Sequence, residues 1–371
     1  MKILVISYKN PSNYVLKKTF VNSLKNKFKI CFVTYESPIS QIYSPDEIKK
    51  KYKVSNVNFF RINKISKLDT LIKDEKPNLI LSYFIESLSP KFFELYFYLK
   101  KLNIPSLKIV EQPFIWREKI FMKKIYNFLS KKSFEYDYGI ICSEISEFSF
   151  FKHSFKNLQY FYNMNYQVFL NIDQKKNSKK KFNVFLDENF VFHPDIKIGK
   201  VQNIPKPNIY YKQLITWFDS LNENKNEKVM IAAHPTTKKN NFNHHPIVFN
   251  KTANFIKNSK LVILHHSSAI DLAILLKKDL LFITTNEINL ISDGKYISEL
   301  AKYFRTSPIN ISKDFDIELV NDYIVKYSEK KMLYKKFKDE FIKHPLCNKT
   351  ENITSIVKKM IWKKDLRLKE V

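Results

Sequence analysis

The sequence predicts an α/β fold of two Rossmann-type domains, each built on a parallel sheet, that face a central cleft. Short apolar runs of strand length alternate with helical patterns along most of the chain. One charged segment with few apolar residues, 171–181 (NIDQKKNSKKK), interrupts this alternation, and the pattern restarts after it. The predicted domains are therefore residues 1–175 and 176–345, followed by a helical tail over 346–371.

The first predicted domain begins with KILVISY, a short and strongly apolar run that is typical of a buried parallel strand. Comparable runs are predicted as strands at 2–8, 29–35, 57–62, 78–84, 106–113 and 139–143. Helices are predicted between them at 14–27, 67–73, 91–102 and 117–130. The alternation favours a parallel sheet with helices on both faces.

The second predicted domain repeats this organisation. Its strands are predicted at 182–186, 228–235, 260–266, 279–285 and 308–312. Its helices are predicted at 210–221, 252–257, 267–276, 297–304 and 317–341, and a tail helix at 353–363. Ligands of such sheets bind at the carboxyl ends of the strands, which points to the cleft between the domains.

Glycine occurs only three times in 371 residues, at Gly139, Gly199 and Gly294. Three isolated glycines exclude both GxGxxG and GxxxxGK[ST], the glycine-rich loops that cradle phosphates. A nucleotide site in this chain must therefore hold phosphate with helix N-termini and side chains.

The formal net charge is +28, from 64 basic and 36 acidic residues, and only four of the basic residues are arginine. Heavy use of lysine, asparagine and isoleucine is what an AT-rich genome produces, and this is the first interpretation. Attraction to the anionic inner membrane comes second. Nucleic acid comes last, because its readers favour arginine for bidentate contacts, so we expect no nucleic-acid partner.

The three cysteines, Cys31, Cys142 and Cys347, are far apart and lack metal-ligand spacing. They are predicted to be small buried side chains in a reducing compartment. No apolar run reaches ~18 residues, the length of a membrane span. The sequence thus predicts a soluble, cytoplasmic protein, with peripheral attachment to the inner membrane as an extension of that location.

Polar residues follow directly after two predicted strands of the second domain. LDENFVFHPD supplies Asp187, Glu188, His193 and Asp195, which suit acid–base work or ribose binding, or else form a solvated loop. AAHPTT supplies a histidine with Pro235 and Thr236. His234 there is a donor to a phosphate or a leaving oxygen, or else part of a capped turn.

A third cluster, LVILHHSSAID, ends an apolar strand with His265, His266, Ser267 and Ser268, and Asp271 follows. Either serine is a natural helix N-cap. The same position suits an anion, because free backbone N–H groups and the helix dipole point toward it. A cap alone explains one serine but not the HHSS run.

The first domain contributes one acid, Glu111 in KIVEQPF, at the end of a predicted strand. It is the natural general base for an incoming hydroxyl, or else an exposed loop residue.

Other patterns in the sequence give weaker support for a functional site. The DxD of residues 314–316 is interpreted as a loop and helix cap. His244 and His245 lie in an asparagine-rich loop. Together with His265 and His266 they could suggest zinc, but adjacent histidines on a strand point to opposite faces and no cysteine cluster supports a site. No metal and no cofactor are therefore predicted. The GxSxG nucleophile motif is absent, which disfavours a hydrolase.

AAHP followed by LVILHHSSAIDLAILLKKDLLFIT resembles the C-terminal domains of the bacterial sialyl- and polysialyltransferases, GT-B enzymes with an HP motif and a downstream serine motif. The resemblance implies that His234, Pro235, His266, Ser267 and Ser268 bind the donor phosphate. It implies an N-terminal base, Glu111. The family's acidic motif is D/E-D/E-G, whereas this chain has Glu-Gln-Pro, so Asp187 and Glu188 stay open as rival bases.

Residues 182–290 also look like bacterial surface-carbohydrate proteins, including the CDP-glycerol glycerophosphotransferases of teichoic-acid synthesis, which show a similar strand, SS and acid arrangement. The expectation is a metal-independent, inverting GT-B glycosyltransferase of capsule or lipopolysaccharide synthesis. Its donor would be a CMP-activated acidic sugar, sialic acid-like or Kdo-like, and its acceptor a glycan or lipid-linked glycan. The alternatives are a CDP-polyol phosphotransferase and, outside enzymes, a basic nucleic-acid or membrane-surface binding protein.

Overall fold

The computed structural model describes most of the chain and divides it into two compact units. The described residues are 1–8, 11, 13–35, 55–83, 90–111, 134–144, 154–172, 182–192, 204–225, 228–237, 239–313, 316–347 and 351–367. Unit 1 contains the described residues up to 164 and those from 343 onward, and unit 2 contains residues 165–342. The chain thus enters unit 2 earlier than the predicted boundary at 175, and its end returns to unit 1.

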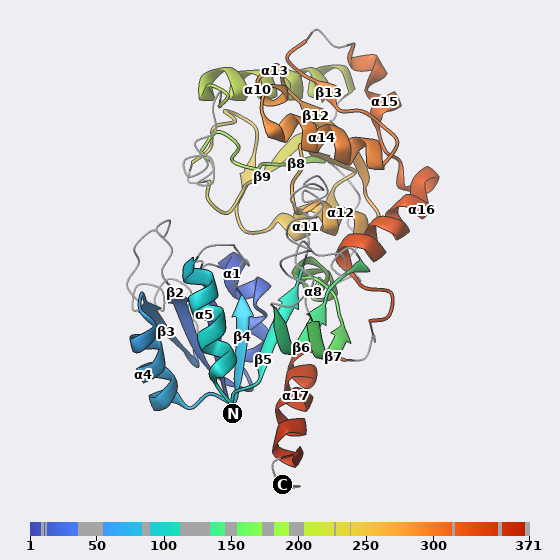
Figure 1. Ribbon diagram of the computed structural model, residues 1–371. Coiled ribbons are helices and arrows are strands. Elements are labelled where there is room, and N and C mark those ends of the chain that lie inside the picture. Colours follow the sequence, from blue (N-terminus) through green and yellow to red (C-terminus); the bar gives the residue numbers. More distant parts are fainter. Residues whose placement is uncertain are drawn as a thin grey trace. The chain divides into compact units, whose positions relative to one another are not determined.

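The described part of unit 1 holds a seven-stranded parallel sheet in the order β3-β2-β1-β4-β5-β6-β7. The strands are β1 (Lys2–Ser7), β2 (Lys29–Tyr35), β3 (Val57–Ile62), β4 (Leu79–Tyr83), β5 (Ser106–Val110), β6 (Glu135–Ile141) and β7 (Ser154–Tyr160). Its helices include α1 (Asn13–Lys18), α2 (Val21–Leu24), α4 (Ile65–Glu75), α5 (Pro90–Lys101) and α17 (Ile353–Arg367). Figure 1 shows α5 in front of these strands.

The described part of unit 2 holds a six-stranded sheet in the order β10-β9-β8-β11-β12-β13. The strands are β8 (Asn183–Leu186), β9 (Val229–Ala232), β10 (Ile247–Val248), β11 (Leu261–Leu264), β12 (Asp279–Thr284) and β13 (Ile309–Asn310). The helices are α8 (Met164–Leu170, whose first residue belongs to unit 1), α10 (Pro207–Lys225), α11 (Thr252–Asn258), α12 (Ile270–Leu275), α13 (Asn286–Asn289), α14 (Ser292–Tyr303), η2 (Ile317–Leu319), α15 (Val320–Tyr323), α16 (Tyr327–Phe337) and η3 (Lys338–Ile342).

Both sheets follow the Rossmann order. The chain starts in the middle of each sheet, builds outward on one side, then crosses back and builds on the other. The direction reverses between β1 and β4 in unit 1, and between β8 and β11 in unit 2. The prediction of two Rossmann-type parallel-sheet domains is confirmed.

Burial explains why the central strands could be predicted. From Ile3 to Ser7 every residue of β1 is buried, and β8 and β11 are buried throughout. Strands covered on both faces have continuous apolar sequences rather than alternating ones. The edge strand β7 was missed, because its residues are largely exposed and polar.

Two predicted helices are broken in the structure. The helix predicted at 14–27 is divided into α1 and α2, because the buried Phe20 takes a left-handed backbone conformation with φ of 55°. The long helix predicted at 317–341 is interrupted where Val325 pairs with Leu280 in an antiparallel bridge. That bridge draws the chain onto the edge of the unit 2 sheet, and helical periodicity alone does not reveal it. The helix predicted at 117–130 and residues 173–181 of the predicted linker lie outside the described residues.

The predicted C-terminal tail is part of unit 1. The Tyr138 hydroxyl on β6 donates to the carbonyl oxygen of Met360 on α17 at 2.8 Å. The backbone N–H of His344 donates to the Cys142 carbonyl at 3.1 Å, and the His344 ring stacks on Tyr160 with centroids 4.0 Å apart. Figure 1 shows α17, coloured red, extending downward from below the much earlier strand β6.

The three cysteines are free and buried, as predicted. Burial is the main reason that the pKa of the Cys31 thiol rises to about 12. Among the described residues, no helix is long and apolar enough to cross a membrane.

Candidate functional site

The predicted polar clusters of unit 2 follow three neighbouring strands. The order β9-β8-β11 places the residues after each strand at one carboxyl edge of the sheet. Asp187 and Glu188 follow β8, His234 follows β9, and His265 and His266 follow β11. Hydrogen bonds join the residues after β8 to those after β9 and to those after β11. The residues predicted at these strand ends therefore lie close together.

Asp187 organises the turn after β9. Its Oδ2 accepts from the Thr237 hydroxyl at 2.8 Å and from the His234 backbone N–H at 3.4 Å, and its Oδ1 accepts from the Asn189 backbone N–H at 2.8 Å. Burial raises the pKa of Asp187, and these hydrogen bonds oppose the rise. By accepting from three donors, the Asp187 carboxylate fixes the backbone of the His-Pro-Thr-Thr turn.

The His234 ring is held in one tautomer. Its Nδ1 accepts from the Thr236 backbone N–H at 3.2 Å and lies 2.7 Å from the Thr236 hydroxyl, which in turn accepts from the Asn189 amide at 2.8 Å. Because Nδ1 is an acceptor, the neutral ring carries its proton on Nε2. His234 therefore presents an N–H at its outer nitrogen, the form that donates to a phosphate oxygen.

Glu188, His266 and Asp293 form a carboxylate–imidazole–carboxylate group. The His266 backbone N–H donates to Glu188 Oε1 at 2.8 Å, His266 Nδ1 lies 3.5 Å from Glu188 Oε2, and His266 Nε2 lies 2.8 Å from Asp293 Oδ1. Burial alone would lower the pKa of His266, but the two carboxylates outweigh it and raise the pKa to about 9. Burial raises the pKa of Glu188. At neutral pH, His266 is therefore an imidazolium.

Asp293 was missed from the sequence. It stands in the first turn of α14, 27 residues after its partner His266. The helix was predicted to begin at residue 297, so Asp293 and Gly294 were left in a connecting segment. The usable signal was the pattern of an acid at the start of a helix that follows a strand.

His265 has a structural role. It is fully buried, its Nδ1 donates to the Ile283 carbonyl at 2.7 Å, and its Nε2 therefore accepts from the Tyr210 hydroxyl at 3.0 Å. Burial lowers the pKa of His265 to about 4. It stays neutral at physiological pH and fixes β11 against β12.

The predicted helix cap by Ser267 or Ser268 is wrong. Residues 267–269 form a turn, the six-residue helix α12 begins at Ile270, and its N-cap is Ala269 without a side-chain cap. Ser267 Oγ accepts from the Ala269 N–H at 3.3 Å, whereas Ser268 is exposed. A helix of six residues does not provide an anion site at its N-terminus, so any donor contact of these serines comes from the turn.

Asn165 on α8 fixes the segment that follows. Its side-chain amide donates to the Ser268 carbonyl and to Asp271 Oδ2, both at 2.9 Å. Asp271, predicted as a site residue, is therefore an anchor of this turn within unit 2. No sequence pattern predicted a role for Asn165, which lies more than a hundred residues before Ser268.

Glu111 lies in unit 1, and both of its carboxylate oxygens contact neighbouring residues. Its Oε2 is 2.7 Å from Lys18 Nζ, and its Oε1 accepts from the Met164 backbone N–H at 3.2 Å. The side chain is 10% exposed, so it is not the freely exposed loop glutamate that was the alternative. The remaining predicted residues, His193 and Asp195, lie outside the described residues, as do Gln112 and Pro113.

The two adjacent histidines, 244 and 245, lie in a turn before β10, within the loop where the sequence placed them. The Nε2 atoms of both rings approach Asp219.

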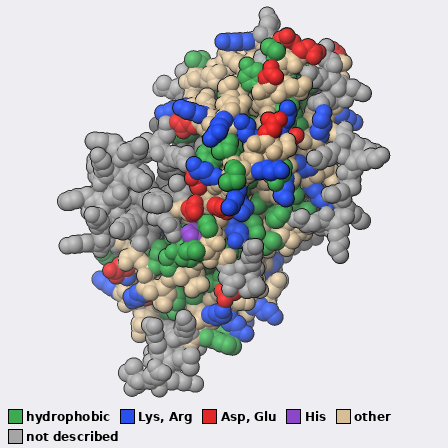
Figure 2. Space-filling model, turned by 90° about the vertical axis from the view of Figure 1, so that its right-hand side faces the viewer, with side chains coloured by type: hydrophobic (Ala, Val, Ile, Leu, Met, Phe, Trp, Pro, Cys, Tyr) green, Lys and Arg blue, Asp and Glu red, His purple; other side chains and the backbone are tan. Residues whose placement is uncertain are grey.

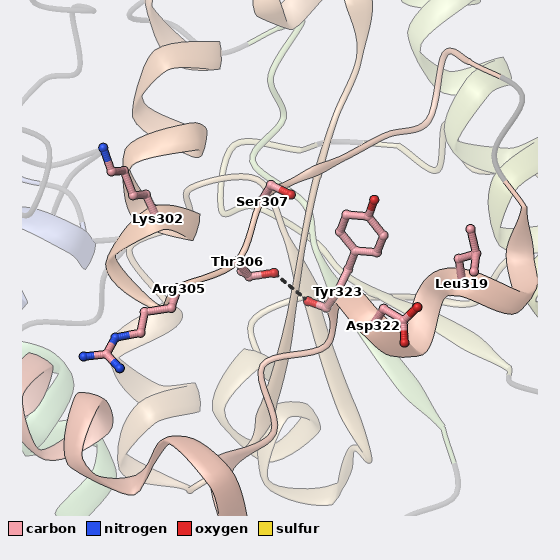
Figure 3. Close-up of a pocket in the computed structure, with 7 residues that line it drawn as sticks. All are labelled: Lys302, Arg305, Thr306, Ser307, Leu319, Asp322 and Tyr323. Atoms are coloured by element: carbon pink, nitrogen blue, oxygen red, sulfur yellow. Dashed lines mark hydrogen bonds between the residues drawn. The ribbon is translucent and has the colours of Figure 1, made fainter.

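Unit 2 also has a pocket that is lined by residues other than those of the predicted site. Its volume is about 540 Å³, and it is lined by Lys302, Arg305, Thr306, Ser307, Leu319, Asp322 and Tyr323. Figure 3 shows Lys302 and Arg305 on one side and Leu319 and Asp322 on the other. Between them the Thr306 hydroxyl donates to the Tyr323 carbonyl at 3.2 Å. The pocket contains none of the predicted site residues.

The basic side chains do not gather in one stripe on the face shown in Figure 2. Lysine and arginine side chains are scattered over the described surface of this face, with acidic side chains among them.

No family model and no curated protein sequence matches the chain. Among solved structures, the UDP complex of S. aureus MnaA has 13% sequence identity and a TM-score of 0.52, over 98% of this chain and 97% of that one. A variant of the wall teichoic acid polymerase TagF has 13% identity and a TM-score of 0.51, over 100% of this chain and 90% of that one. At such identity the likeness shows the fold alone. The chain has a GT-B-like fold.

Proposed function

We propose that the chain is a glycosyltransferase-type enzyme that binds a nucleotide-activated donor at the carboxyl edge of the unit 2 sheet. One observation carries the proposal: Glu188 and His266 are bonded to each other on the two sides of the β8–β11 reversal point. In open parallel sheets, nucleotides bind outside the strand ends at that point.

The residues of this edge suit the parts of such a donor. The Nε2–H of His234 supplies a donor for phosphate oxygens as negative charge develops on the leaving group. The imidazolium of His266 holds the carboxylates of Glu188 and Asp293 in place at the same edge. Asp293 is 27% exposed, and its carboxylate suits a ribose hydroxyl. Ser267 and Ser268 would contact the donor from the 267–269 turn.

The proposed reaction is inverting transfer without a metal. The acceptor hydroxyl attacks the anomeric carbon, the bond from that carbon to the phosphate oxygen breaks, and the nucleotide leaves with the electron pair. Glu111 is the first candidate to take the hydroxyl proton. Asp187 and Glu188 stay as rival candidates, because all three acids already accept hydrogen bonds from neighbouring residues.

The first candidate donor is a CMP-linked acidic sugar, supported by the resemblance of the His-Pro and Ser-Ser motifs to those of sialyltransferases. A CDP-polyol donor is the second candidate, supported by the strand, Ser-Ser and acid arrangement. The acceptor would be a surface glycan or its lipid-linked precursor at the inner membrane, where lysines would add electrostatic attraction.

Thermal denaturation with added nucleotides tests this proposal. Stabilisation by CMP supports the first donor, and stabilisation by CDP-glycerol supports the second. His234→Ala and His266→Gln should each abolish the nucleotide response. Stabilisation by nucleic acid alone would contradict the proposal in favour of a binding protein. Full transfer activity in His234→Ala would contradict the assignment of the site.

A further inference from the structure

A group of three metal-ligating side chains lies outside the site described above. Asp219 stands on α10, and His244 and His245 stand in the turn that leads into β10. Nε2 of His244 is 2.8 Å from Asp219 Oδ1, and Nε2 of His245 is 3.1 Å from the same oxygen. The three potential ligand atoms all lie within 4.8 Å of one another.

The backbone explains how two consecutive histidines face one point. Asn243, directly before them, has a left-handed conformation with φ of 48°, and the His245 N–H donates to the Phe242 carbonyl at 3.0 Å. The Asn240 side chain closes the same loop by donating to the Asn243 carbonyl at 3.0 Å. The two imidazole rings end with centroids 4.4 Å apart.

His245 is oriented as a ligand before any ion binds. Its side chain is only 6% exposed, and its ring lies edge-to-face with Phe218 at 5.5 Å. The ring is hydrogen-bonded to the Val229 backbone, and its Nε2 faces Asp219 Oδ1 at 3.1 Å. A metal-binding histidine is typically fixed in this way through its other nitrogen.

The arrangement directs a buried ring nitrogen at a carboxylate. Nε2 of His245 is buried and makes no hydrogen bond of good geometry, although it lies 3.1 Å from Asp219 Oδ1. A metal ion beside these two atoms would be bound by both of them.

We propose that Asp219, His244 and His245 bind a divalent transition-metal ion of the zinc class. Two imidazole nitrogens and one carboxylate oxygen suit zinc, and a fourth position remains for water or another ligand. His244 is 65% exposed and Asp219 is 33% exposed, so this position faces solvent. Tetrahedral zinc with bonds of about 2.0 Å needs ligand atoms roughly 3.3 Å apart, which the two exposed side chains reach by small movements.

The ion would act on stability and not on the transfer chemistry. It would tie α10 to the loop that precedes β10, and β10 pairs with β9, whose end carries His234. A site of this kind stabilises the folded unit by mass action when metal is present.

The experiment uses the full chain without a histidine tag, stripped of metal by a chelator and desalted. Zinc is titrated against a chromophoric competitor, and cobalt is added separately to record its visible absorption. The native chain should bind one equivalent of zinc, give the cobalt bands of a site with nitrogen and oxygen ligands, and unfold at a higher temperature with zinc.

His244→Ala and Asp219→Asn should each weaken zinc binding at least tenfold and remove the zinc-dependent rise in unfolding temperature. Both side chains are partly exposed, so these variants avoid the buried His245. Glu223→Gln is the matched control, because it removes one acid from the same helix at an exposed position. His266→Gln should bind zinc as the native chain does, which separates this site from the candidate donor site. Absence of stoichiometric binding, or unchanged affinity in His244→Ala and Asp219→Asn, would overturn the proposal.

Discussion

The backbone N–H of His266 donates to Glu188 Oε1 at 2.8 Å, although the two residues are 78 positions apart. The bond joins the ends of β8 and β11, the two strands between which the order of the unit 2 sheet reverses. The chain thereby places an imidazolium and a buried carboxyl where Rossmann-type sheets bind nucleotides. Because the chain has no glycine-rich phosphate loop, groups that bind a phosphate at this point would have to come largely from side chains.

The raised pKa of His266 predicts a pH-dependent contribution to stability. Its folded value is about 9, above the ordinary value of 6.5, so its stabilisation is complete below pH 6.5 and is lost as the pH rises through about 9. The stability difference between the native chain and His266→Gln should shrink by up to roughly 3 kcal/mol across that window. Urea denaturation at pH 6.5 and 9 measures it, and a difference that stays constant would contradict the assignment.

Asp187 should contribute to stability and to donor binding through the turn that it holds. Asp187→Asn replaces one acceptor oxygen with an amide that faces the same donors, at a cost of about 1–3 kcal/mol. Thr237→Val removes only the hydroxyl that donates to Asp187 at 2.8 Å, so its cost should be smaller. Both variants should weaken nucleotide binding by displacing His234, as measured by calorimetry. Native affinity in a folded Asp187→Asn chain would show that the turn does not position the histidine.

The sequence was sufficient to predict the centre of each sheet. Strands such as β1 and β8 are buried on both faces, so their apolar runs stand out, and the polar residues after them mark the carboxyl edge. The sequence was insufficient where the backbone conformation or pairing of one residue interrupts a helical pattern. The left-handed Phe20 divides a helix that periodicity presents as continuous, and Val325 leaves a helical pattern to pair with Leu280.

The site was predictable to the extent that it follows strands. Glu188 and His266 were found because each stands just after a strand that the sequence reveals. Asp293 and Asn165 were not found, because they reach the same region from helices. Their partners are fixed by the packing of those helices, which has no local signature in the sequence.

Gly294 should be required for the position of Asp293. A Cβ added at Gly294 would lie 2.5 Å from the Asn289 Cα and 2.7 Å from the Ile288 carbonyl oxygen, so α13 and α14 would have to separate. Gly294→Ala should destabilise unit 2 by about 1–3 kcal/mol. It should also lower the pKa of His266, which NMR titration of the ring measures, because one of its two carboxylates moves away.

Gly139→Ala is the matched control for that variant. Its Cβ would lie 2.5 Å from the Phe155 ring, within unit 1, so it should also destabilise the protein. It should leave the titration of His266 unchanged, because that residue belongs to unit 2. Equal effects of the two alanine variants on the His266 titration would show that Gly294 acts only through general stability.

Glu111→Gln separates the proposed base from the proposed donor site. If Glu111 takes the acceptor proton, the variant should lose about 10²–10⁴-fold in kcat while nucleotide affinity stays native, because Glu111 belongs to unit 1. Glu135→Gln is the control, since Glu135 is an exposed acid of the same unit that lies 3.4 Å from Lys100. Single-turnover transfer and nucleotide titration measure the two quantities. A Glu111→Gln enzyme with native kcat would transfer the role to Asp187 or Glu188, whose amide variants should then lose the proton-transfer step.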